Sequence, residues 1–121
     1  MQDFKKLSVW KRAHEMVLDI YRVSRDFPVA ERYGLTSQIR RASTSVATNI
    51  AEGCGRRGDR EMLQFVSTAL ASANEVEYEL LLARDLGFLP ASSYAKLSAG
   101  QTDLQKMLHG LIRTLRQQAM R

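Results

Sequence analysis

The sequence predicts an all-α protein folded as an up-down-up-down antiparallel four-helix bundle. Apolar side chains recur at spacings of three and four over four separate segments, which is the period of an amphipathic helix. The connections between these segments are short and carry Pro or Gly, so consecutive helices are expected to alternate in direction. No segment shows the strict polar and apolar alternation that is typical of a half-buried β-strand.

The predicted helices cover residues 8–26, 35–52, 59–86 and 90–118, within one domain that spans residues 1–121. Ser8 and Asp59 are expected N-caps, because their side-chain oxygens can accept hydrogen bonds from free amides of the first turn. The first helix ends before Pro28, since the residue before a proline avoids helical angles. Gly53 and Gly87 are expected to end the second and third helices in the left-handed conformation that favours glycine.

Each predicted helix carries an apolar seam that we expect to face the core. The seams are Leu7, Trp10, His14, Val17, Tyr21 and Ser24; Ile39, Ala42, Val46 and Ile50; Met62, Val66, Ala69, Ala73, Val76, Leu80 and Ala83; and Tyr94, Leu97, Gln101, Leu104, Leu108, Leu111 and Leu115. His14 is therefore expected to be a core histidine. Apolar residues partly outside the main seams are Met62, Leu63, Leu70, Leu82, Met107 and Ile112. They indicate either a wide core stripe or an interface between subunits.

The charge of the chain is unevenly distributed. The 121 residues carry a formal net charge of +5, and their 45% hydrophobic and 26% charged content is ordinary for a globular protein. Residues 1–60 hold 12 Lys and Arg against 7 Asp and Glu, residues 61–90 hold 1 against 5, and residues 91–121 hold 5 against 1. This asymmetry permits a nucleic-acid-facing side, and equally permits basic and acidic surfaces that pair between subunits.

Several classes of protein are disfavoured by the sequence. A single cysteine, Cys54, fits a reducing compartment, and we expect a cytoplasmic protein with no membrane partner, because no apolar run approaches the roughly 18 residues of a membrane helix. His14 and His109 have no ligands at metal-binding spacing, and the glycines around Cys54 lack the Gly-Lys-Ser/Thr ending of a phosphate-binding loop. Arg56 and Arg57 could make Cys54 reactive, but a lone loop cysteine is expected to be incidental. We therefore expect no catalytic residues, no metal, no cofactor and no enzymatic activity.

Basic residues cluster around the predicted end of the second helix and start of the third. Arginine suits phosphate because its planar fork can donate two hydrogen bonds at once, and free amides at a helix start also favour anions. No RNA-recognition aromatic motif accompanies these residues, so binding would depend mainly on the phosphate backbone. The candidate nucleic-acid-binding residues are Arg40, Arg41, Arg56, Arg57 and Arg60, extended by Lys5 and Lys6.

Four polar residues are candidates for partial burial between helices. They are Gln38, Asn49, Glu52 and Glu75. A half-buried carboxylate needs a partner because burying it unpaired is costly, and Arg41 is one possible partner for Glu75. We interpret these residues as structural, since a hydrogen-bond set between helices would fix their register. A ligand site is the alternative interpretation.

The stretch from Phe27 to Gly53 also resembles a known family. The letters FP-x-x-E-x-YGL-x-x-QIRRA-x-x-S-x-x-x-NIAEG resemble the four-helix-bundle proteins encoded in intervening sequences of bacterial 23S rRNA genes. The similarity extends upstream to Leu7 and Trp10, and downstream through Phe65 and Glu75 to the leucine-rich C-terminal helix, and so covers nearly the whole chain. The resemblance implies a four-helix bundle and a homo-oligomer, with a cyclic pentamer as the associated state. A more distant similarity to accessory proteins of diversity-generating retroelements implies contact with a reverse transcriptase and nucleic acid.

Together these observations predict a non-enzymatic bacterial protein that binds RNA or another nucleic acid as an oligomer. The alternative is a protein-interaction, scaffold or accessory subunit with no direct role in nucleic-acid binding. Salt separates the two hypotheses, because phosphate binding weakens steeply as salt rises, whereas an apolar interface does not.

Overall fold

The computed structural model describes residues 3–120, and every regular element in that range is a helix. The four α-helices are Ser8–Ser24 (α1), Leu35–Cys54 (α2), Asp59–Asp85 (α3) and Ala91–Ala119 (α4). Two short 3-10 helices, Phe4–Lys6 (η1) and Val29–Glu31 (η2), precede α1 and α2. The predicted all-α, four-helix fold is confirmed. The largest differences in helix bounds are at the ends of α1 and α2, which stop two residues earlier and two residues later than predicted.

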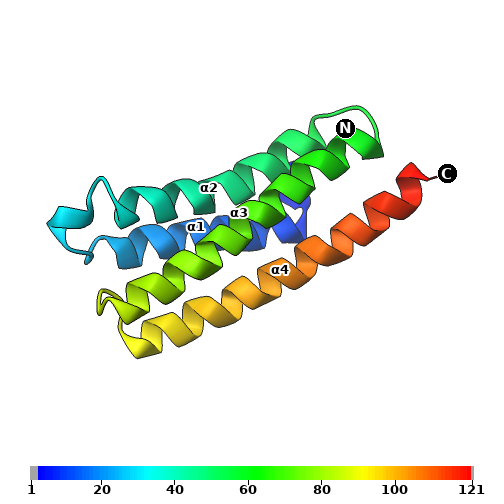
Figure 1. Cartoon of the computed structure of the whole chain (residues 1–121). Coiled ribbons are helices and arrows are strands. Elements are labelled where there is room, and N and C mark those ends of the chain that lie inside the picture. Colours follow the sequence, from blue (N-terminus) through cyan, green and yellow to red (C-terminus); the bar gives the residue numbers. More distant parts are fainter. Residues whose placement is uncertain (1–2, 121) are drawn as a thin grey trace.

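The four α-helices form a bundle in which each helix packs beside two others (Figure 1). α2 packs against α1 and α3, and α4 packs against α3 and α1, so the order along the chain is also the order around the bundle. Consecutive helices run in opposite directions. The start of α1, the α2–α3 connection and the end of α4 therefore share one end of the bundle, which we call the α2–α3 end. The remaining two connections share the opposite end, which we call the α1–α2 end.

The predicted seams of α2, α3 and α4 supply most of the core. Their buried members are Ile39, Ala42, Val46 and Ile50 of α2, Val66, Ala69, Ala73, Val76, Leu80 and Ala83 of α3, and Leu97, Gln101, Leu104, Leu108 and Leu115 of α4. Met62, Tyr94 and Leu111 are half-buried at the margins of this core. Small residues lie at two contacts between α2 and α3, Ser45 with Ser72 and Gly53 with Phe65, which allows the two helices to approach closely there.

The predicted core seam of α1 is wrong in part. The buried residues of α1 are Val9, Ala13, Met16, Ile20 and Ser24, whereas His14 and Tyr21 are exposed. The His14 ring stacks on the half-buried Trp10 ring at a centroid distance of 5.0 Å, so His14 is a surface residue and not a core histidine. Two neighbouring stripes of α1 are apolar, and the amphipathic Trp10 and Tyr21 lie at the rim of the core, where a ring can be partly wet.

The apolar residues outside the main seams pack against the same core. Ile112 is buried, and Met62, Leu63, Leu70, Leu82 and Met107 are half-buried against it. This arrangement favours the wide core stripe over an exposed apolar interface. Association between copies stays a prediction, and the molecular mass in solution, measured by light scattering, tests it.

The helix ends follow the sequence in part. At Gly87, with φ +80°, the amide donates to the carbonyl of Arg84 and the next amide donates to that of Ala83, which is the left-handed cap predicted for α3. The expected caps at Ser8 and Asp59 are wrong by one residue, because the preceding Leu7 and Gly58 are the N-caps. Neither makes a side-chain capping bond.

Gly53 does not end α2, contrary to the prediction. It is buried inside the helix, which continues to Cys54, and a Cβ at this position would lie 3.2 Å from the Cβ of Phe65 on α3. The glycine is therefore needed for the close approach of α2 to α3, and not for a left-handed turn.

Replacing Gly53 by Val is expected to lower the free energy of unfolding by about 1–3 kcal/mol, because the added methyl groups overpack the contact with Phe65. Gly110 in α4 is the matched control, since a Cβ at that position would have as its nearest neighbour the flexible Arg113 guanidinium, at 3.8 Å. Urea denaturation followed by circular dichroism measures both variants. Equal losses in Gly53→Val and Gly110→Val would contradict the packing role of Gly53.

Candidate nucleic-acid interface

The basic residues predicted as one patch lie at the two ends of α2. Arg40 and Arg41 are in its second turn at the α1–α2 end, whereas Arg56 and Arg57 follow its last turn at the α2–α3 end. The helix runs from Arg40 to its end at Cys54, two residues before Arg56, and this segment is about 21 Å long at 1.5 Å per residue. The expectation of a single patch around the end of α2 is therefore corrected to two separate basic regions.

The region at the α2–α3 end, which we call the loop cluster, comprises Lys5, Lys6, Arg56, Arg57 and Arg60. The Lys5 and Lys6 side chains are exposed on η1, which packs against α2, so the structure brings them to the predicted end of the bundle. Arg56 is already engaged, because its Nη2 lies 3.2 Å from Glu52 Oε2 and its guanidinium carbon lies 4.8 Å from the centroid of the Phe65 ring. Arg57 and Arg60 are exposed.

The start of α3 is a weaker anion site than the sequence indicated. Asp59 and Glu61 occupy its first turn, and their charges already meet the positive end of the helix dipole. Over residues 52–61, Arg56, Arg57 and Arg60 face three carboxylates, so this stretch carries no net charge. The loop cluster therefore gains its positive charge mainly from η1.

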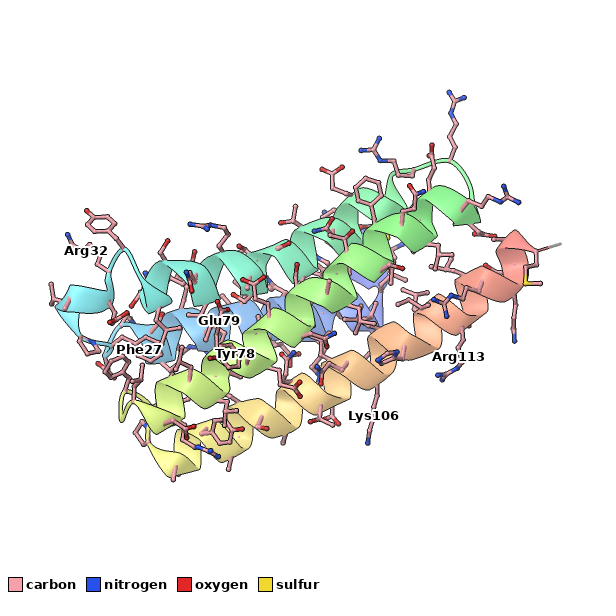
Figure 2. The ribbon with its side chains drawn as sticks, in the orientation of Figure 1. Phe27, Arg32, Tyr78, Glu79, Lys106 and Arg113 are labelled. Atoms are coloured by element: carbon pink, nitrogen blue, oxygen red, sulfur yellow. The ribbon has the colours of Figure 1, made fainter. Side chains whose placement is uncertain are left out.

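A larger basic region lies at the α1–α2 end. We call it the arginine surface and define it as Tyr21, Arg22, Arg25, Arg32, Tyr33, Arg40 and Arg41. Residues 19–41 hold five arginines against three carboxylates. The last turn of α1, the connection with η2 and the first turns of α2 meet here, and Arg32 projects from this end in Figure 2.

Three open hollows indent the arginine surface, and Arg40 lines all of them. Their volumes are about 440, 270 and 380 Å³. Arg25 lines the first two, while Arg32 lines the second and third. The hollows therefore adjoin one another around Arg40.

Arg22, Arg25 and Arg32 were not predicted as site residues, because the sequence pattern places the first two on a solvated helix face. Their positions in the sequence could have identified them, because they lie in the last turn of α1 and in the connection that follows it. Antiparallel packing brings these segments beside the start of α2.

The Arg40 side chain is held in place by α1. Its Nε donates a 2.8 Å hydrogen bond to Ser24 Oγ, and its guanidinium carbon lies 4.6 Å from the centroid of the Tyr21 ring. Arg41 Nη2 donates to Ser37 Oγ at 3.2 Å. Arg22 is paired with Asp19, whereas Arg25 and Arg32 are exposed and form no ion pair with any described residue. The arginine surface thus combines guanidinium groups that are held by hydrogen bonds with exposed ones that form no ion pair with a described residue.

The four predicted structural polar residues do not form a bond set between helices. Gln38, Glu52 and Glu75 are exposed, and Asn49 is half-buried with its Nδ2 donating to Ser45 of the same helix. Glu52 pairs with Arg56 of its own connection. A side-chain bond that does join α2 to α3 is the 2.9 Å contact between the hydroxyls of Ser45 and Ser72.

The buried polar residues of the core are different ones, and two of them have an oxygen without a partner. Glu79 on α3 is 4% exposed, and its Oε1 accepts no hydrogen bond from the described residues. Burial, followed by the nearby charge of Glu75, raises the pKa of Glu79 to about 7, while the Arg41 charge acts in the opposite direction. Gln101 donates from Nε2 to the Ala73 carbonyl, and its Oε1 is also unpartnered within residues 3–120.

Glu79 was missed although its spacing from Val76 and Ala83 places it beside the α3 seam. Its position among the acidic residues of that half of α3 indicated a solvated side chain instead.

Cys54 is not an activated thiol. It is buried, and this burial, followed by the charge of Asp3, raises its pKa, so Arg56 and Arg57 do not produce the lowered value that reactivity requires. Among residues 3–120, no three His, Cys, Asp or Glu side chains gather as a possible metal site. Within the same described range, no helix is both long and apolar enough to cross a lipid bilayer.

Comparisons with known proteins agree with this architecture. A comparison with curated protein sequences found no match. Among solved structures, a protein of unknown function from the S23 ribosomal protein family of Bacteroides thetaiotaomicron is similar in fold, with a TM-score of 0.80 and 24% sequence identity. The similarity covers 86% of this chain and 97% of that one. Residues 5–110 match the sequence profile of the 23S rRNA-intervening sequence protein family, which is the family that the motif from Phe27 to Gly53 resembles. This match spans most of the chain, which therefore belongs to the 23S rRNA-intervening sequence protein family.

Proposed function

We propose that this protein binds RNA through the arginine surface at the α1–α2 end of the bundle. The observation that carries the proposal is the gathering of five arginines around three adjoining hollows that share Arg40. The loop cluster is assigned a weaker, secondary role, because its arginines are balanced by neighbouring carboxylates. RNA is the polyanion that the sequence predicts, and it is therefore the first one to test.

The chemistry of the surface suits a phosphate backbone. A guanidinium group is always charged and its rigid fork matches two phosphate oxygens, which gives charge-assisted hydrogen bonds of about twice the neutral strength. Arg40 is fixed by Ser24 and Tyr21, so little side-chain entropy is lost when it binds a phosphate. Arg25 and Arg32 are free to reach a second and a third phosphate. If copies associate, an oligomer would present several such surfaces and raise the apparent affinity.

A salt titration tests this proposal directly. With three or four phosphate contacts on a single strand, the logarithm of the binding constant is expected to fall with the logarithm of salt concentration at a slope of about −2 to −3. The affinity for a fluorescent RNA should therefore drop roughly 20- to 50-fold between about 50 and 200 mM salt. Fluorescence anisotropy measures the slope.

A slope near zero would contradict phosphate binding. So would the absence of RNA binding at low salt, and that result would favour a protein-interaction subunit. An acidic peptide of matched charge is the control ligand, because a protein that attracted all polyanions alike would bind this peptide as strongly as it binds RNA.

A further inference from the structure

One aromatic ring of the arginine surface is left almost entirely in water. Tyr33 is 88% exposed, although its neighbours in the same hollow include Arg32, Arg40 and Arg41. Tyr21 also lines this hollow of about 380 Å³, and it is 43% exposed. An isolated exposed aromatic residue is common on protein surfaces. An exposed ring beside a hollow lined with guanidinium groups is a different feature, since the two groups together match the parts of a nucleotide.

The backbone that carries Tyr33 is ordered by its own hydrogen bonds. The Gly34 amide donates to the Glu31 carbonyl at 2.9 Å, and the Leu35 amide donates to Glu31 Oε1 at 3.0 Å. The turn closes tightly, because a Cβ at Gly34 would lie 2.8 Å from Glu31 Oε1. The ring of Tyr33 is thus presented on a fixed turn, which lowers the entropy that a ligand has to remove when it stacks on the ring.

The two tyrosines differ in what they can still contact. One face of the Tyr21 ring is covered by the Arg40 guanidinium at 4.6 Å from the ring centroid. That contact helps to orient Arg40, which also lines the hollow. Tyr33 makes no comparable aromatic or cation contact with a described residue, so its faces remain open to a ligand.

We propose that the hollow between Tyr33 and Tyr21 holds an unpaired nucleobase stacked on Tyr33, so that the protein prefers single-stranded to double-stranded RNA. This inference rests on the proposed RNA binding and adds the class of RNA. The phosphates on either side of the stacked base contact Arg32, Arg40 and Arg41. A base has a flat apolar face whatever its identity, so stacking adds affinity without sequence specificity.

A duplex cannot use this site in the same way. Its bases are stacked within the helix, and the deep, narrow major groove of A-form RNA keeps side chains away from their edges. Duplex RNA therefore contacts only the arginines, and its affinity does not depend on Tyr33.

Anisotropy with two probes of the same sequence tests the inference: an unstructured RNA oligonucleotide and its blunt duplex. Tyr33→Ala is expected to weaken single-strand binding at least about fivefold, because base–aromatic stacking contributes roughly 1–3 kcal/mol and about 1.4 kcal/mol is a factor of ten. Tyr33→Phe should bind like the parent protein, since stacking needs the ring and not the hydroxyl group. Duplex affinity should be the same in all three proteins.

Tyr78→Ala is the matched control, because Tyr78 is also an exposed tyrosine, 61% exposed, but lies on α3 (Figure 2) and lines none of the hollows of the arginine surface. It should leave both affinities unchanged. The inference is overturned if Tyr33→Ala binds the single strand as tightly as the parent protein, or if it weakens duplex binding equally. In both cases the RNA binding itself survives. If the parent protein binds neither RNA probe, the proposed function and this inference are overturned together.

Discussion

Reversing the charge of Arg25 and Arg32 together is expected to weaken RNA binding at low salt by at least about 100-fold. Each lost charge-assisted contact removes about 1.5–3 kcal/mol, so two lost contacts remove about 3 kcal/mol or more, which corresponds to roughly two orders of magnitude. The introduced glutamates also repel the phosphates. Both side chains are exposed, so Arg25→Glu with Arg32→Glu should leave the helical content measured by circular dichroism unchanged.

The matched control is the pair Lys106→Glu and Arg113→Glu on α4, which changes the net charge by the same amount away from the arginine surface (Figure 2). It should weaken binding only slightly, through the long-range field. An equal loss in both pairs would mean that the overall charge of the protein, and not the arginine surface, controls binding.

The loop cluster at the α2–α3 end is the competing location for the main RNA site, and substitutions in it test this alternative. Replacing Arg56, Arg57 and Arg60 by Ala is expected to lower the RNA affinity by less than about tenfold, because Arg56 is already paired with Glu52. A larger loss than that of the charge-reversal pair at Arg25 and Arg32 would move the main site to the α2–α3 end.

Replacing Glu79 by Gln is expected to stabilise the protein at pH 8 and to remove much of its pH dependence. The pKa of Glu79 is about 7 in the folded protein, above the ordinary value of 4.5 that applies when the chain is unfolded. Between these two values the folded state binds the extra proton, so the free energy of unfolding falls as pH rises. The contribution of protonated Glu79 to the free energy of unfolding is fully present below about pH 4.5 and is lost as the pH rises through 7. The loss between about pH 5 and 8 amounts to about 2–3 kcal/mol.

Urea denaturation at several pH values measures this effect, and Glu77→Gln is the control because Glu77 is exposed on the same helix. The glutamine at position 79 cannot ionise, so its variant should lack the decrease that the parent protein and Glu77→Gln both show. Parallel stability curves for Glu79→Gln and the parent protein would mean that Glu79 titrates alike in the folded and unfolded states.

The fold was predictable because three of the four helices carry only one apolar stripe each. In α2 this stripe consists of small and medium-sized residues, and in α4 it is wider than the heptad, because Ile112 is buried and Met107 is half-buried beside it. In α1 two adjacent stripes compete, and the sequence does not state which one contacts α2 and α4. Trp10 and Tyr21 are large enough to suggest a core position, yet their polar atoms suit the rim, where Tyr21 supports Arg40.

The candidate site was less predictable, because it depends on how close the helices lie. Arg25 and Arg32 belong to a surface with Arg40 only after α1 and α2 have packed antiparallel. Periodicity also does not encode how closely α2 and α3 approach one another, as they do at Gly53 and at the Ser45–Ser72 contact, and it does not show that Glu79 of α3 is buried. Glycine is found both at helix ends and where two helices approach closely, so the sequence pattern predicts a helix end at Gly53. Only the neighbouring Phe65 on α3 shows that the close approach is the reason for the glycine.

The position of the two basic regions at opposite ends of α2 has a consequence for how their contributions combine. Groups that are separated by about 21 Å of helix and share no partner should contribute independently, so the affinity losses from the two regions should add for an RNA too short to span them. A longer strand that touches both ends is tethered by its first contact, and the second contact then forms at a high effective concentration. The coupling energy between the two sets of substitutions, measured against RNA length, would thus show at what length a single molecule begins to bridge the helix.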